Sequence, residues 1–76
     1  MMKQFSITGK VVFEPLEGGF WGIVDDQGGQ WLPVDFPEGL KKQGIRVHVI
    51  ARESEDMVSI FLWGTPVQLF SYRILS

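Results

Sequence analysis

The chain has 76 residues, of which 45% are hydrophobic and 13% aromatic, with a formal net charge of −2 and no cysteine. This length predicts a single domain over residues 1–76, and the missing cysteines exclude a disulfide framework and a thiolate zinc site. The nearly neutral charge lacks the cationic excess that contacts to phosphate require.

The start of the chain does not have the pattern of a signal peptide. Residues 1–5 lead directly into an alternating apolar pattern instead of a continuous apolar segment. No segment approaches the ~20 apolar residues that span a bilayer. We therefore expect a cytoplasmic protein that does not enter a membrane, unless an export signal has been removed.

The first predicted strand is unusually long. Its odd-numbered positions carry the apolar side chains Phe5, Ile7, Val11 and Phe13. Alternation with a period of two is typical of a strand with one buried face. Gly9 lies at the middle of this alternation, where the absence of a side chain permits the strand to bend.

The next two predicted strands form a hairpin. Proline and paired glycines over 14–19 indicate a loop, after which residues 20–24 form the second strand. The turn residues over 25–29 tolerate a left-handed backbone and lead into a third strand over 30–34. Pro33 cannot donate a ladder hydrogen bond, so it marks the third strand as an edge strand or as irregular.

Residues 35–44 are the only segment with the start and stop residues of a helix. Asp35 can cap the first turn, Pro37 suits that turn, and Gly44 suits the end. The predicted helix has at most two turns, with Leu40 as its buried anchor.

The remainder of the chain is predicted to be extended. Residues 45–52 alternate between apolar and polar side chains, which predicts a fourth strand. An acidic turn over 53–56 precedes a fifth strand over 57–63. The last segment, 67–75, is expected to be either a sixth strand or an arm that covers apolar side chains.

This order of elements predicts an all-β fold, namely a small OB-like Greek-key barrel of five to six strands with one short helix between strands three and four. An SH3-like barrel is the alternative, because it is similarly small and rich in strands. The helical segment between strands three and four favours the OB-like barrel.

Four short motifs resemble a group of small prokaryotic OB-like domains of unknown function. These motifs are Glu17-Gly18-Gly19-Phe20-Trp21-Gly22-Ile23, Leu32-Pro33, Phe36-Pro37 and Trp63-Gly64-Thr65-Pro66-Val67. The similarity covers the chain from Gly9 to Val67. It implies an OB-like barrel without catalytic residues.

Few residues could support catalysis. His48 is the only histidine, and the charge of the nearby Arg46 disfavours a protonated imidazole, so we expect a solvated strand residue. The acidic residues at 25–26 and 53–56 lack the spacing of a calcium loop. Neither glycine pair has the lysine and hydroxyl of a phosphate-binding loop. We therefore predict no catalytic residue, no cofactor, no metal site and no enzyme activity.

Binding of single-stranded nucleic acid is the function that this fold suggests first, because aromatic side chains on strands two and three stack on bases. Trp21 and Trp31 lie in these strands. However, the loops at 14–19 and 53–56, which flank the ligand groove of the fold, are acidic and repel phosphate. Weak nucleic-acid binding is therefore kept only as the alternative function.

An excess of large apolar side chains on strands two and five is the main indication of function. Both faces of a strand cannot point into one small barrel, so the last segment or a partner must cover some of these side chains, or they lie exposed. We predict a non-enzymatic interaction module that binds another protein, itself or an uncharged ligand through an aromatic face. The candidate binding residues are Trp21, Ile23, Trp31, Phe61 and Trp63.

Overall fold

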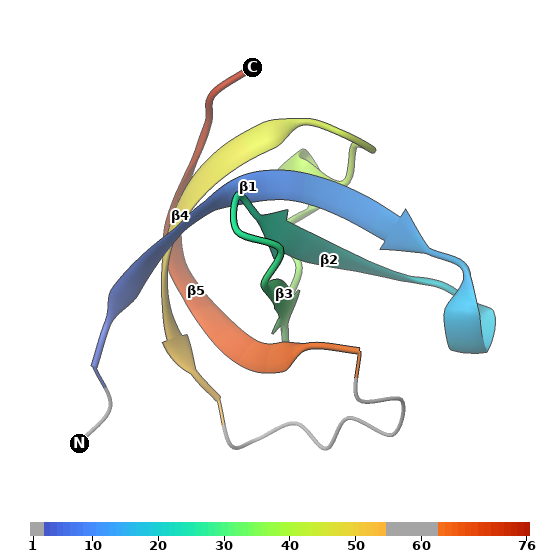
Figure 1. Ribbon diagram of the computed structural model, residues 1–76, viewed down its shortest axis with the longest axis horizontal. Helices are drawn as coiled ribbons and strands as arrows, with labels where there is room; N and C mark the ends of the chain where they lie inside the picture. Colours follow the sequence, from blue (N-terminus) through green and yellow to red (C-terminus); the bar gives the residue numbers. More distant parts are fainter. Residues whose placement is uncertain (1–2, 55–62) are drawn as a thin grey trace.

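The computed structural model describes residues 3–54 and 63–76. Within these residues, five strands form a closed barrel in the order β1-β2-β3-β5-β4, as Figure 1 shows. The strands are β1 (Phe5–Glu14), β2 (Phe20–Asp25), β3 (Gln30–Pro33), β4 (Arg46–Glu53) and β5 (Thr65–Ile74). Together with the parallel pairing of β3 and β5, this order confirms the small OB-like barrel.

β1 takes part in two antiparallel ladders. Its first part pairs with β4 over 5–10, and its second part pairs with β2 over 9–14. Gly9 belongs to both ladders, and a Cβ at this position would overlap the carbonyl oxygen of Val24 and lie 2.6 Å from the Cα atom of Asp25. The sequence predicted that Gly9 permits a bend, and the structure gives a further reason for glycine at this position: two backbones approach each other there.

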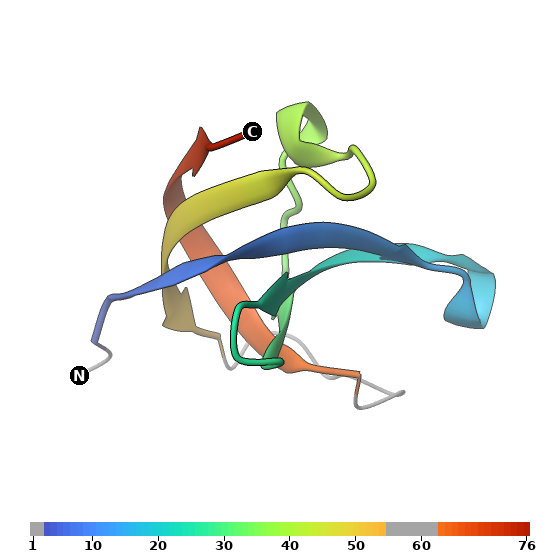
Figure 2. The same cartoon turned by 45° about the horizontal axis from the view of Figure 1, so that its top comes forward.

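The described loops contain two short 3-10 helices, η1 (Leu16–Gly18) and η2 (Glu38–Leu40). η2 lies between β3 and β4, as predicted, but it has a single turn. Pro37 precedes this turn in an extended conformation, and Gly39 within it disfavours further helix. Leu40 is completely buried, which confirms it as the anchor of this segment. Figure 2 shows η2 at one end of the barrel.

The C-terminal segment is a strand of the barrel. β5 pairs parallel with β3 over 65–67 and antiparallel with β4 over 67–74. The strand predicted over 57–63 lies outside the described residues except for Trp63, which precedes β5. β3 is paired on both sides, so it is not an edge strand. Its Pro33 lies beyond the residues that pair with β2.

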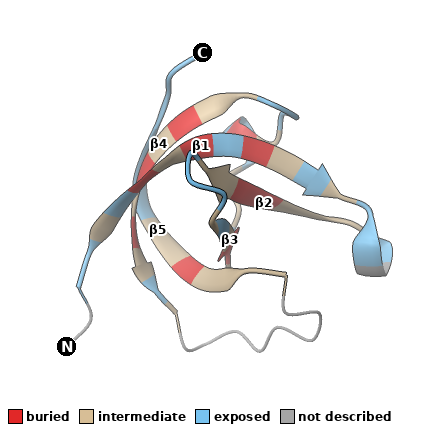
Figure 3. Ribbon diagram, in the orientation of Figure 1, coloured by how far each residue is buried: buried red, intermediate tan, exposed pale blue. Residues whose placement is uncertain are grey.

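The interior of the barrel is aliphatic, and Figure 3 shows the buried residues on the strands and on η2. Among the described residues, no polar or charged side chain is buried. Polar chemistry is therefore confined to the surface of the barrel. The core consists of Ile7, Val11, Ile23, Leu40, Val47, Val49, Ala51 and Val67.

Candidate functional site

The candidate binding residues from the sequence occupy separate places in the barrel. Trp21 and Trp31 are half-buried and pack against the core from neighbouring strands. Ile23 is completely buried between the strands, so its side chain is not available to a partner. Trp63 packs outside the core cluster, and Phe61 lies outside the described residues. The described part of the chain therefore does not bring the three tryptophans into one face.

Trp21 belongs to an aromatic cluster beside the loop between β1 and β2. Its ring centroid lies 5.1 Å from that of Phe13, in an edge-on arrangement, and 6.2 Å from that of Phe36. Phe13 is 42% exposed, whereas Trp21 is half-buried. Trp21 thus packs against the aliphatic core from its margin, and Phe13 is the more exposed ring of this cluster.

Trp31 is held by the turn between β2 and β3. Its indole Nε1–H donates to Oδ2 of Asp25 at 2.8 Å, while Oδ1 of Asp25 accepts the backbone N–H groups of Gln27 and Gly29, each at 2.8 Å. The hydrogen bond from Trp31 and those from the turn hold the pKa of Asp25 below its ordinary value. The sequence predicted the turn but missed the contact between Asp25 and the indole.

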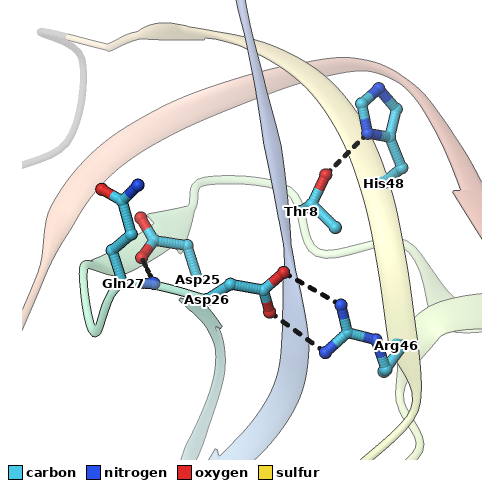
Figure 4. Close-up of polar contacts among 6 residues, drawn as sticks. All are labelled: Thr8, Asp25, Asp26, Gln27, Arg46 and His48. Atoms are coloured by element: carbon cyan, nitrogen blue, oxygen red, sulfur yellow. Dashed lines mark hydrogen bonds and ion pairs between the residues drawn. The ribbon is translucent and has the colours of Figure 1, made fainter.

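A surface hollow of about 300 Å³ lies between this turn and the first part of β1. It is lined by Ser6, Ile7, Thr8, Asp25, Asp26, Gln27 and Trp31. The side chains of Thr8, Asp25 and Asp26 in this lining already have partners within the chain, as Figure 4 shows. Asp26 accepts two hydrogen bonds of 3.0 Å from Arg46, and this pairing lowers the pKa of Asp26.

His48 also has a hydrogen-bond partner on the neighbouring strand. Its Nδ1 lies 2.8 Å from Oγ1 of Thr8 on β1, and the residue is half-buried (Figure 4). The prediction of a simply solvated strand residue is therefore corrected. The described residues contain no group of three or more histidine, aspartate and glutamate side chains that could hold a metal ion. The polar side chains Asp25, Asp26 and His48 on this surface form hydrogen bonds within the chain.

Trp63 covers the outer surface of β2. A Cβ at Gly22 would lie 2.5 Å from Cζ3 of the Trp63 indole, so the missing side chain provides the space that the ring fills. The ring of Phe20 meets the same indole edge-on at a centroid distance of 5.4 Å. With its amide assigned from the hydrogen-bond network, Gln30 donates to the Trp63 carbonyl oxygen at 2.8 Å and accepts from Nε1 at 3.3 Å. Trp63 therefore covers part of β2, and OB folds bind oligonucleotides and oligosaccharides on the face of their second and third strands.

A group of three exposed apolar side chains lies at the C-terminal end of β5. Phe70 is 50% exposed, and Tyr72 and Ile74 are each 48% exposed. The guanidinium of Arg52 on β4 lies 5.8 Å from the centre of the Phe70 ring. The sequence left open whether Val67, Leu69, Tyr72 and Ile74 cover the barrel. Of these, Val67 belongs to the core and Leu69 packs against it, whereas Tyr72 and Ile74 are exposed.

The same part of β5 has an open edge. Within the described residues, β3 pairs with β5 only as far as Val67, and Figure 2 shows the two segments diverging beyond that point. The N–H of Leu75 donates to the carbonyl of Arg46 at 2.8 Å. Because an antiparallel ladder alternates, Tyr72 and Ile74, opposite Val49 and Val47, direct their backbone groups away from β4. This part of β5 thus combines apolar side chains with an available edge.

Comparison with protein-family models, with curated proteins and with solved structures gives no match for this chain. The resemblance to small prokaryotic OB-like domains stays a prediction. Over residues 3–54 and 63–76, the chain forms no helix with the length and hydrophobicity that a membrane crossing requires.

Proposed function

We propose that this chain is a non-enzymatic interaction module that binds an extended protein segment along the C-terminal part of β5. The observation that carries the proposal is the coincidence of an open strand edge with Phe70, Tyr72 and Ile74, each about half exposed. An extended peptide adds to such an edge through main-chain hydrogen bonds, while the flanking side chains supply apolar contact.

The positions of the polar residues support a binding function over catalysis. Asp25, Asp26 and His48 are of the residue types that serve in acid–base catalysis, and each is hydrogen-bonded within the chain. A catalytic acid or base requires a reacting group within hydrogen-bond reach. In this chain those positions are taken by Trp31, Arg46 and Thr8.

The nucleic-acid alternative receives less support. Trp63 covers Gly22 on the surface of β2 where a base would stack. The chain also has nine acidic against seven basic residues, so it has no excess of positive charge for phosphate. We therefore keep binding of single-stranded nucleic acid as the weaker candidate.

The proposal can be tested with a phage-displayed library of random dodecapeptides selected on the immobilised chain. We expect enriched peptides to bind the wild-type chain and the Leu16→Lys variant, but not the Tyr72→Pro variant. Leu16 is a matched control because it is 49% exposed and lies on η1, away from β5 (Figure 1). Proline at position 72 removes an N–H that faces the open edge, so it blocks strand addition without breaking the ladder to β4.

Amide chemical shifts of the labelled chain identify the binding surface. Shifts confined to residues 69–74 on addition of an enriched peptide support the proposal. Enriched peptides that bind the Tyr72→Pro variant equally, or that shift residues on the β2–β3 surface instead, contradict it.

A further inference from the structure

The open edge of β5 has the properties of a self-complementary surface. Resting on the proposed function of this edge, we propose that its occupant is a second copy of the same chain, joined through antiparallel pairing of the two β5 strands about a two-fold axis at Tyr72. An edge that is open in one copy is equally open in the other, and such an arrangement closes both edges at once.

The hydrogen-bonding pattern of β5 fixes which residues can pair. Tyr72 and Ile74 direct their N–H and C=O groups to the open side, because the Leu75 N–H donates to β4. An axis at Tyr72 makes the two Tyr72 residues a hydrogen-bonded pair. Phe70 is the extra residue of a β-bulge between the partners of Ile50 and Ala51, so the regular pairing about this axis covers residues 71–73.

The distribution of charge favours this register and this occupant. Residues 65–75 contain one charged side chain, Arg73, and no acidic residue. An axis at Tyr72 places Arg73 opposite Ser71 of the second copy, whereas an axis at Arg73 would place two cations directly opposite each other. The net charge of −2 per chain adds only weak repulsion between the copies.

The side chains next to the axis are accessible in the single chain. Residues 70–76 are all exposed. Tyr72 and Ile74 are half-exposed, although the β-bulge in β5 places them on the same side as the buried Val67. The hydroxyl of Tyr72 reaches toward Gly39 of η2, where a Cβ would lie 3.5 Å away. The paired strands would extend one sheet from β1 and β4 of the first copy through both β5 strands into the second.

The first experiment measures solution mass by light scattering and by sedimentation equilibrium over a wide range of concentration. We expect the wild-type mass to rise from 8.6 kDa toward twice that value, and the Leu16→Lys control to do the same. The Tyr72→Lys and Tyr72→Glu variants are each expected to remain at the mass of one chain, because like charges then meet at the axis. Mixed in equal amounts, these two variants are expected to form a heterodimer.

A second measurement tests the register. The chain has no cysteine, so Tyr72→Cys introduces a single thiol. A hydrogen-bonded antiparallel pair separates its Cα atoms by about 5.5 Å, which is within the range that a disulfide spans. We expect rapid cross-linking of Tyr72→Cys on mild oxidation and at least tenfold slower cross-linking of Leu16→Cys.

The outcomes separate this inference from the function on which it rests. A mass of one chain at all concentrations, with selected peptides still shifting residues 69–74, overturns self-pairing and leaves the peptide-binding function in place. A dimer that survives both charged variants, with no preferential cross-linking at position 72, overturns self-pairing because another surface then forms the dimer. If neither peptides nor a second copy bind β5, both proposals are wrong.

Discussion

The indole of Trp63 fills the space that a side chain at position 22 would need. A Cβ on Gly22 would lie 2.5 Å from Cζ3 and 2.6 Å from Cη2 of the ring. These atoms are at the far end of a side chain, so the ring can move without displacing the backbone of β2. We expect Gly22→Ala to release Trp63 from the barrel surface and to leave the fold intact.

Nuclear magnetic resonance of the indole N–H groups checks this expectation. The chain has three tryptophans, and the Trp63→Phe variant identifies the signal of Trp63. In Gly22→Ala, that signal should move toward the position of a solvent-exposed indole and exchange faster, while the Trp31 signal stays in place. A collapse of the amide spectrum, or a shift of Trp31 alone, would show that Trp63 does not occupy this space.

Replacement of Gly9 tests the junction of the two ladders of β1. A Cβ there would overlap the carbonyl oxygen of Val24, and backbone atoms cannot move aside independently. We expect Gly9→Ala to lower the free energy of unfolding by about 1–3 kcal/mol. Gly39→Ala is the matched control, because its Cβ would make an ordinary contact of 3.5 Å with the Tyr72 hydroxyl. Equal urea midpoints for the two variants would contradict the role of Gly9.

The local pattern of the sequence predicted the part of the fold that depends on neighbouring residues. Alternation over 5–13 identified β1, and the turn residues over 25–29 identified the β2–β3 hairpin. Leu40 could be identified as an anchor because it is the one large apolar residue in the sequence from 38 to 44. Each of these features is determined by side-chain period or turn chemistry within about ten residues.

The sequence could not predict the contacts that depend on strand order. The parallel pairing of β3 with β5 joins Trp31 to Thr65, which are far apart in the chain, and periodicity carries no information about such a partner. For the same reason the open edge of β5 was missed: it follows from β3 being only four residues long. The contact of Trp63 with Gly22 likewise joins residues that are far apart in the chain.

The hydrogen bonds to Asp25 predict a pH dependence of stability. The Trp31 indole and the turn amides lower the pKa of Asp25 below its ordinary value of 3.8 in the folded chain. The unfolded chain therefore binds this proton more readily, so the stabilisation is present above about pH 3.8 and is lost as the pH falls through the folded pKa. Asp26 acts in the same direction through Arg46.

Urea unfolding at a series of pH values measures this effect. We expect the wild-type midpoint to fall below about pH 4, and the Asp25→Asn variant to be less stable at pH 7 but to depend less on pH. Gln27→Ala, which changes an exposed side chain in the same turn and removes no titratable group, should retain the wild-type pH profile. A profile of Asp25→Asn parallel to that of the wild type would exclude Asp25 as a source of the pH dependence.

Leu40 allows a test of whether η2 closes one end of the barrel. This residue is completely buried, although it lies on a helix of three residues. Leu40→Ala removes buried apolar volume and leaves a cavity, so we expect a loss of about 2–4 kcal/mol in the free energy of unfolding. Lys42→Ala, at an exposed position two residues later, should change stability by less than about 0.5 kcal/mol. A loss of less than 1 kcal/mol for Leu40→Ala would mean that the barrel end closes without this side chain.

The pairing of β5 with both β3 and β4 has a consequence for how the chain folds. The strands β1, β2 and β3 form one local meander, and β4 and β5 form a second local unit. The barrel closes only where these units meet, along the β1–β4 and β3–β5 seams. When one seam forms, it already holds the two units together. Most of the entropic cost of bringing the strands of the other seam into contact has then been met. The two seams should therefore form and break together, so that the barrel opens in one cooperative step instead of by fraying at β5.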